Sequence, residues 1–263
     1  MSEEQILEKP EKQQKKHRKL RITLIVVCCL VVAFFVGFRV YVSDFYHADS
    51  TALQQAEAAA GADIAKTTPA ENTTAYSPAG SSPDTGIIFY PGAKVEAAAY
   101  EPLMLDLAAR GYLCVLCEMP SNIAFLDINA AKDVLPLYPS VEHWYLAGHS
   151  MGGSAAGNFT SKNPGTFDGL ILLASYTVDD QDGCVARALS IYGSADGVIN
   201  RENYEKNREN LPADTTELVI EGGNHAGFGA YGPQSGDGTA SITPEDQQHQ
   251  TADAAAAWIE EAK

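Results

Sequence analysis

The decapeptide at residues 144–153, Trp-Tyr-Leu-Ala-Gly-His-Ser-Met-Gly-Gly, constrains the fold more than any other stretch of the chain. A short apolar run leads into Gly-x-Ser-x-Gly, and a segment of small residues that is compatible with a helix follows. This order predicts a strand, a sharp turn and a helix, with Ser150 held at the turn as in a nucleophile elbow. Gly148 and Gly152 fit, because a Cβ at either position would collide with the neighbouring strand or helix. The pattern also occurs by chance, so its meaning depends on the rest of the chain.

Short apolar runs alternate with helix-compatible segments along the chain. The runs expected to form strands are 86–90, 112–117, 143–147, 167–174, 188–192 and 216–220. The expected helices are 101–110, 130–138, 151–162, 201–208 and a last one that begins at Thr243 and Pro244 and ends near Glu260. Apolar strands that alternate with helices are typical of a parallel sheet covered on both faces. The sequence therefore predicts an α/β fold with a mostly parallel sheet of about six or more strands.

Two histidines follow Ser150 and could act as its base, His225 and His249. A serine hydroxyl is a weak nucleophile until a base, itself held in position, takes its proton. Where a serine stands on an elbow of this kind, the acid and then the histidine follow it along the chain. His225 comes directly after the last expected strand, so its loop can return to the serine, whereas His249 lies within the final helix. We therefore favour His225.

The acid is expected at the carboxyl end of a strand, where open α/β sheets carry their sites. Asp196 leaves the expected strand 188–192 through Gly-Ser-Ala and meets this condition. Three aspartates within residues 179–182 follow the preceding strand, but they form a charged run that is typical of a solvated loop. The sequence favours Asp196, which completes a triad with Ser150 and His225.

Backbone N–H groups should stabilise the oxyanion that forms when a serine attacks a carbonyl. One is expected from Met151, the residue after the nucleophile. The second is expected from the loop after the strand 86–90, where Ala93 is preferred and Lys94 is the alternative. His149 precedes the serine and is interpreted as a packing residue that points away from it.

Glu118 and Asn122 follow the expected strand 112–117 at its carboxyl end, which is the edge that should carry the site. Their side chains could contact a substrate there. They could equally serve only to cap the loop, and the sequence leaves both alternatives open.

The charge of −16 is unevenly distributed. Residues 1–42 carry eight Lys/Arg against four Glu, whereas the remainder carries ten Lys/Arg against thirty Asp/Glu. The main domain is therefore strongly acidic, and it has no basic patch of the kind that binds nucleic acid. No nucleic-acid partner is expected.

The five cysteines form neither a disulfide framework nor a zinc pattern. Cys114 and Cys117 have the spacing of a redox pair, but residues i and i+3 of a strand point to opposite faces. They are interpreted as small buried hydrophobic residues. No metal site is expected, and triad chemistry requires no cofactor.

The N-terminal region predicts a membrane anchor. Residues 1–21 form a basic tail, and the uncharged stretch within 22–42 is long enough for one transmembrane helix. Basic residues precede the span, so the tail is expected in the cytoplasm and the remainder outside the cell membrane. A cleaved signal peptide is the alternative, but no small-x-small site follows the apolar stretch. Residues 43–85 are interpreted as a linker with a short helix and one weak edge strand, and 86–263 as the catalytic domain.

Four stretches resemble a known group of proteins. They are Phe-Tyr-Pro-Gly-Ala-Lys-Val at 89–95, Gly-His-Ser-Met-Gly-Gly at 148–153, Ser-Ile-Tyr-Gly-Ser-Ala-Asp-Gly at 190–197 and Gly-Gly-Asn-His-Ala-Gly-Phe-Gly at 222–229. With the tail Tyr-Gly-Pro-Gln-Ser-Gly-Asp-Gly at 231–238, they are similar to bacterial α/β-hydrolases related to dienelactone hydrolase, which are often membrane-anchored. The resemblance implies the α/β-hydrolase fold and the triad already inferred. Dienelactone hydrolases proper use cysteine as nucleophile, so serine here favours esterase-type chemistry.

These features together predict a serine hydrolase that cleaves a carboxylic ester or a related acyl bond. The expected partners are a small-molecule or acylated substrate and the membrane. Two alternatives stay open: an acyltransferase that uses an acceptor other than water, and a catalytically inactive binding module of the same fold. The sequence does not specify the acyl group, the alcohol group or the oligomeric state.

Overall fold

The computed structural model describes residues 3–262, with side chains for residues 16–262. The chain divides into two units, Met1–Asp44 and Phe45–Lys263. The first contains the helix α1 (Glu3–Ser43), whose part Lys16–Ser43 is long and apolar enough to cross a membrane. Its apolar side chains, such as Leu24 and Phe34, are exposed. The side chains of residues 1–15, which belong to the predicted basic tail, lie outside the described residues.

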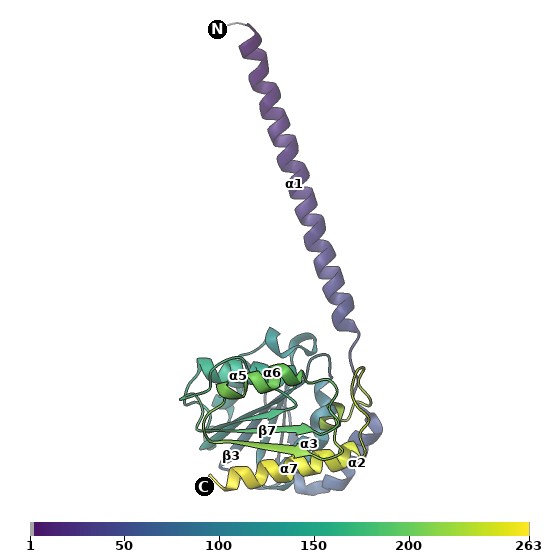
Figure 1. The fold of residues 1–263 in the computed structure, drawn as a ribbon, viewed down its shortest axis with the longest axis vertical. Coiled ribbons are helices and arrows are strands. Elements are labelled where there is room, and N and C mark those ends of the chain that lie inside the picture. The colour runs from purple at the N-terminus through teal and green to yellow at the C-terminus, as the bar shows by residue number, and fades with distance from the viewer. Residues whose placement is uncertain (1–2, 263) are drawn as a thin grey trace. The chain divides into compact units, whose positions relative to one another are not determined.

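The second unit is built on one eight-stranded sheet (Figure 1). Its strands are β1 (Ile64–Thr67), β2 (Thr73–Pro78), β3 (Thr85–Tyr90), β4 (Leu113–Cys117), β5 (His143–His149), β6 (Gly169–Leu173), β7 (Arg187–Gly193) and β8 (Thr215–Ile220). The strand order is β1-β2-β4-β3-β5-β6-β7-β8. The six strands β4, β3, β5, β6, β7 and β8 pair in parallel. At one edge, β2 pairs antiparallel with β4, and β1 pairs antiparallel with β2. The predicted mostly parallel sheet is confirmed.

Helices cover both faces of the sheet. They are α2 (Ser50–Ala60), α3 (Glu101–Ala109), α4 (Ala130–Val134), α5 (Met151–Lys162), α6 (Arg201–Lys206) and α7 (Pro244–Glu260). Helices α2, α3 and α7 pack on one face, and α4, α5 and α6 lie on the other (Figure 1). Helix α7 begins with the predicted cap, in which Thr243 and Asp246 form a capping box and Pro244 occupies the first turn.

Alternate residues of the central strands point into two separate cores. In β3, Ile87 and Phe89 pack beneath α3 and α7, whereas Ile88 packs beneath α5. In β4, Cys114 belongs to the first core and Cys117 to the second. The two cysteines therefore face opposite sides of the sheet, as the strand period predicts.

Most of the region 43–85 differs from the predicted linker, because residues 45–85 belong to the second folded unit. The expected short helix is α2, and the expected weak strand is β2, which pairs with β4. Lys66 of β1 forms ion pairs with Glu57 of α2, at 2.7 Å, and with Glu101 of α3. The edge strand β1 was not expected from the sequence, because none of its four residues is fully buried and it therefore has no apolar run.

The predicted helix 130–138 is also shorter than expected. Helix α4 ends at Val134, and Leu135–Leu137 form a 3₁₀ turn. Pro136 has no amide hydrogen with which to extend the α-helical ladder, which accounts for the early end.

Candidate active site

Ser150 occupies the turn between β5 and α5, as predicted. Its backbone angles are φ 52° and ψ −124°, in a region that an L-residue rarely adopts. Two hydrogen bonds hold this conformation: the Ser150 N–H donates to the Leu173 carbonyl at 2.9 Å, and the Ser175 hydroxyl donates to the Ser150 carbonyl at 2.6 Å. The surrounding structure therefore determines the strained turn.

Glycine is required at two positions of the elbow, because backbone atoms of neighbouring segments lie very close to both. A Cβ at Gly148 would lie 2.5 Å from the backbone at Gly152, and one at Gly152 would lie 2.1 Å from the Tyr90 carbonyl oxygen. Either side chain would force the helix α5 away from the sheet. The steric interpretation of Gly-x-Ser-x-Gly is confirmed.

Asp196 and His225 lie together at the carboxyl ends of neighbouring strands. Asp196 follows β7, His225 follows β8, and Oδ2 of Asp196 is 2.9 Å from Nδ1 of His225. The other carboxylate oxygen, Oδ1, accepts the N–H groups of Val198 and Ile199, both at 2.8 Å. Both side chains are almost completely buried. The structure thus brings two of the three predicted residues into direct contact.

The surroundings of Asp196 favour its ionised form. Burial alone would raise the pKa of this carboxyl group. The hydrogen bond and positive charge of His225, with the amides of Ile199 and Val198, outweigh burial and hold the pKa of Asp196 below its ordinary value. Asp196 can therefore orient Nδ1–H of His225 as a carboxylate.

The remaining ring nitrogen of His225, Nε2, is buried and has no hydrogen-bond partner among the described residues. The Ser150 hydroxyl does not reach it in this structure. The contact that joins the two loops is made by the residue before Ser150, because the ring of His149 packs on the His225 ring with 4.5 Å between centroids. Catalytic hydrogen bonds are often long without substrate and tighten in the complex.

His149 has closer connections to the site than the sequence indicated. It is a buried packing residue, but the ring against which it packs is that of His225. Its Nδ1 lies 2.8 Å from the Tyr100 hydroxyl. Burial, together with the charge of His225, holds the pKa of His149 well below its ordinary value. No sequence signal pointed to Tyr100, which lies at the start of α3.

The loop after β3 distinguishes between the two candidate oxyanion donors. The Lys94 N–H donates to the Asn122 carbonyl at 2.8 Å, so it is already occupied. In the part of the chain that the structure describes, the N–H groups of Ala93 and Met151 donate to no acceptor. These are the two groups preferred from the sequence, and their role in binding an oxyanion stays a prediction.

Of the two candidate substrate residues, only Asn122 is held near this loop. Its carbonyl accepts the Lys94 N–H, and its backbone has a positive φ of 55°. Glu118 is exposed, and its N–H donates to the Asn72 carbonyl on the far side of β4 from β3. Contact of Asn122 with a substrate stays a prediction. Within the described part of the chain, Glu118 has no hydrogen bond to the loop after β3 of the kind that Asn122 has.

The alternative base and acid lie elsewhere. His249 of α7 is exposed, and its Nδ1 is 3.1 Å from Asp106 of α3. Asp179 accepts a hydrogen bond from Asn158 in the middle of α5. Neither residue contacts the pair formed by Asp196 and His225.

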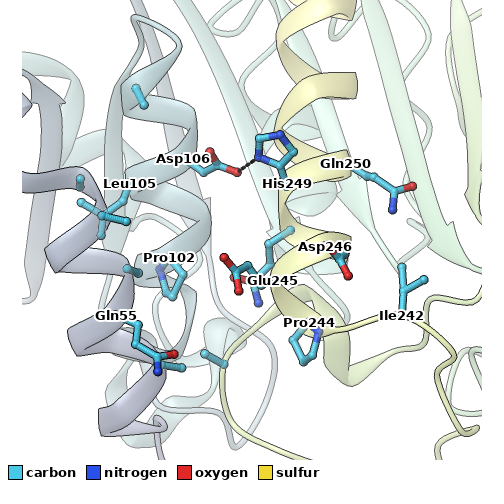
Figure 2. Close-up of a pocket in the computed structure, with 17 residues that line it drawn as sticks. Gln55, Pro102, Leu105, Asp106, Ile242, Pro244, Glu245, Asp246, His249 and Gln250 are labelled. Carbon is cyan, nitrogen blue, oxygen red and sulfur yellow. Dashed lines mark hydrogen bonds and ion pairs between the residues drawn. The ribbon is translucent and has the colours of Figure 1, made fainter.

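A surface pocket of about 670 Å³ lies between α2, α3 and the start of α7, in the helical layer that covers one face of the sheet. Figure 2 shows Asp106 and His249 pointing toward one another across it, with Pro102 and Pro244 on its walls. Ser150, Asp196 and His225 do not line this pocket. Among the described residues, no cluster of His, Cys, Asp and Glu could hold a metal ion.

Comparison with known proteins agrees with this architecture. A model of the alpha/beta hydrolase family matches residues 86–249, more than half of the chain. The chain belongs to the α/β-hydrolase family. The resemblance inferred from the sequence motifs is confirmed at this level.

A solved structure supports the fold of this α/β-hydrolase. It is a predicted CIB-like hydrolase from Thermoplasma acidophilum, with a TM-score of 0.55 and 17% sequence identity. The match covers 74% of this chain and 99% of the other. No protein with a curated description matches the sequence.

Proposed function

We propose that this α/β-hydrolase is a serine hydrolase that cleaves a carboxylic ester, or a related acyl bond, through an acyl-enzyme. The observation that carries the proposal is the buried contact between Asp196 and His225, which leaves Nε2 of His225 unpartnered while the His225 ring packs on His149, the residue before Ser150. A buried imidazole that is oriented by a carboxylate and has one free nitrogen is suited to accept a serine proton.

In the first half-reaction, Ser150 Oγ attacks the carbonyl carbon and its proton passes to Nε2 of His225. Asp196 keeps Nδ1–H in place and stabilises the imidazolium that forms. The N–H groups of Met151 and Ala93 hydrogen-bond the oxyanion. The imidazolium then protonates the leaving alcohol, and the acyl group stays on Ser150.

In the second half-reaction, His225 takes a proton from water, whose oxygen attacks the acyl carbon. The tetrahedral intermediate collapses, His225 returns its proton to Ser150 Oγ, and the carboxylic acid leaves. Each oxyanion donor is expected to contribute about 10²–10³ in turnover, as in other serine hydrolases.

We further propose that α1 anchors the catalytic unit outside the cell membrane. The length and apolar surface of Lys16–Ser43 and the basic residues that precede the apolar stretch support this topology. Reporter fusions after Phe45 test it. Activity of a reporter that functions only in the cytoplasm would overturn it.

A fluorophosphonate probe tests the enzymatic proposal directly, because it forms an adduct only with an activated serine. The full chain in detergent should be labelled at Ser150, and Ser150→Ala should abolish the label. The matched control is Ser161→Ala, which removes a hydroxyl from the far end of α5 and should be labelled normally. A folded wild-type protein without an adduct would support the inactive binding module instead.

Product analysis distinguishes hydrolysis from transfer. With an activated ester and an added alcohol or amine, the hydrolase yields the free acid as its main product. Predominant formation of the acylated acceptor would favour the acyltransferase. A panel of esters of increasing chain length then defines the acyl group.

A further inference from the structure

The carboxylate of Asp237 accepts four backbone N–H groups. Its Oδ1 accepts from Gly197 at 3.1 Å, from His225 at 3.2 Å and from Gly238 at 2.8 Å. Its Oδ2 accepts from Ala226 at 2.8 Å. One side chain therefore accepts four backbone donors, of which those of His225, Ala226 and Gly238 are half-buried.

Three of these donors, those of Gly197, His225 and Ala226, belong to the two loops that carry the candidate acid and base. Gly197 directly follows Asp196, and the other loop contributes the N–H groups of His225 itself and of Ala226. The 2.9 Å contact between Asp196 and His225 depends on the relative position of these loops. Asp237 joins them through the main chain, independently of that contact.

A second set of hydrogen bonds fixes the loop of Asp237 in turn. The Asn224 side chain donates to the Gly238 carbonyl at 2.8 Å. The buried Gln247 of α7 brackets the Asn224 backbone, accepting its N–H at 3.0 Å and donating to its carbonyl at 2.8 Å. The arrangement thus connects Asp237 and the base loop to a rigid helix.

Only a carboxylate fits this position. It presents two acceptor oxygens and no donor, whereas an amide of the same shape would place an NH₂ group against at least one backbone N–H. Hydrogen bonds to a charged acceptor are also stronger than those to a neutral one.

We propose that Asp237 is a positioning residue of the hydrolase, which sets the distance between Asp196 and His225 by holding both loops. This inference rests on the proposed serine hydrolase function. Asp237 contacts neither the reacting atoms nor a substrate, so its loss should affect the chemical step and leave substrate binding intact.

The test is Asp237→Asn in the full chain, assayed on an ester. We expect kcat to fall by about 10²-fold, the effect of a misplacement of about 1 Å, with KM changed less than threefold. The rate of Ser150 labelling by the fluorophosphonate should fall in parallel, while labelling still goes to completion. The matched control is Asp246→Asn, which removes a carboxylate from the capping box of α7 and should lower stability without changing kcat.

Wild-type kcat in Asp237→Asn, or a rise of KM alone, would overturn the proposal. If Asp237→Asn does not fold, Asp237→Glu replaces it, because it keeps both oxygens but displaces them by one methylene. Reduced kcat at unchanged KM in that variant supports the proposal, and wild-type kcat overturns it. Failure of the proposed function is distinct, because wild-type protein would then lack both activity and label.

Discussion

The Tyr100 hydroxyl oxygen lies 2.8 Å from Nδ1 of His149 and accepts the Gly92 N–H at 3.0 Å. The one hydroxyl therefore contacts both the amide of Gly92 and the ring of His149. Gly92 precedes the candidate oxyanion donor Ala93, and His149 packs on His225. This buried contact therefore links the oxyanion loop to the candidate base.

Replacing Tyr100 by Phe should impair both stability and catalysis. The ring still fits, but the Gly92 N–H and His149 Nδ1 lose their partner, at a cost of about 1–3 kcal/mol in the free energy of unfolding. Because the oxyanion loop loosens, kcat should fall at least about tenfold, part of the contribution of one donor. Urea denaturation and ester kinetics measure the two effects.

Tyr112→Phe provides the control. It also removes a buried phenol, but one whose partners are Ala256 and Glu260 at the far end of α7. It should leave kcat unchanged. Equal kcat values for the two variants would show that the link through Tyr100 has no catalytic role.

The lowered pKa of His149 predicts that the folded protein loses stability on mild acidification. Its pKa in the folded protein is held well below the ordinary value of 6.5 by burial and by the charge of His225. Below about pH 6.5 the unfolded chain therefore binds a proton that the folded chain does not, and the free energy of unfolding falls as the pH falls.

The variant His149→Gln removes this titration. Between about pH 6 and 5, the slope of the free energy of unfolding against pH should decrease by up to about 1.4 kcal/mol per pH unit. Asp196 acts in a lower range, because its lowered pKa stabilises the fold above its ordinary value of 3.8 and that contribution is lost only as the pH falls through the folded value. An unchanged slope would contradict the assignment to His149.

Ser150→Ala is expected to reduce turnover by about 10⁶, as in other serine hydrolases. His225→Gln should have a comparable effect, since nucleophile and base act as a unit. The corresponding change at the alternative base, His249→Gln, alters contacts with Asp106 of α3 and Asp253 of α7 and should retain near wild-type kcat. A loss below tenfold for Ser150→Ala would refute the assignment of the nucleophile.

Asp196→Asn should reduce kcat by about 10⁴, because an amide at this position favours the wrong tautomer of His225. Its substrate affinity should change little. Asp179→Asn is the matched control, since Asp179 was one of three alternative acids and contacts Asn158 of α5 instead. A large loss of kcat in Asp179→Asn, with near wild-type kcat in Asp196→Asn, would contradict the assignment of Asp196 as the acid.

Much of the site could be predicted from the sequence, because its elements are local. The elbow needs a strand, small residues and a serine within about ten positions, and all are visible in residues 144–153. The order of Ser150, Asp196 and His225 follows from where the strands end. The cap of α7 is equally local, as is the alternation that separates Cys114 from Cys117.

Other features depend on partners distant in the chain. Strand β1 joined the sheet because β2 offered unpaired backbone groups, which composition does not reveal. The choice of Ala93 over Lys94 depended on which N–H the Asn122 carbonyl occupies.

The sequence by itself determined where most strands and helices after residue 85 form and in which order the catalytic candidates follow one another, because periodicity, capping and turn geometry act over a few residues. Only the tertiary structure decided how those candidates are held, through Tyr100 against His149 and Asp237 against two loops. Hydrogen-bond partners of buried groups are chosen by the packing of distant segments, and that packing leaves no periodic trace in the sequence.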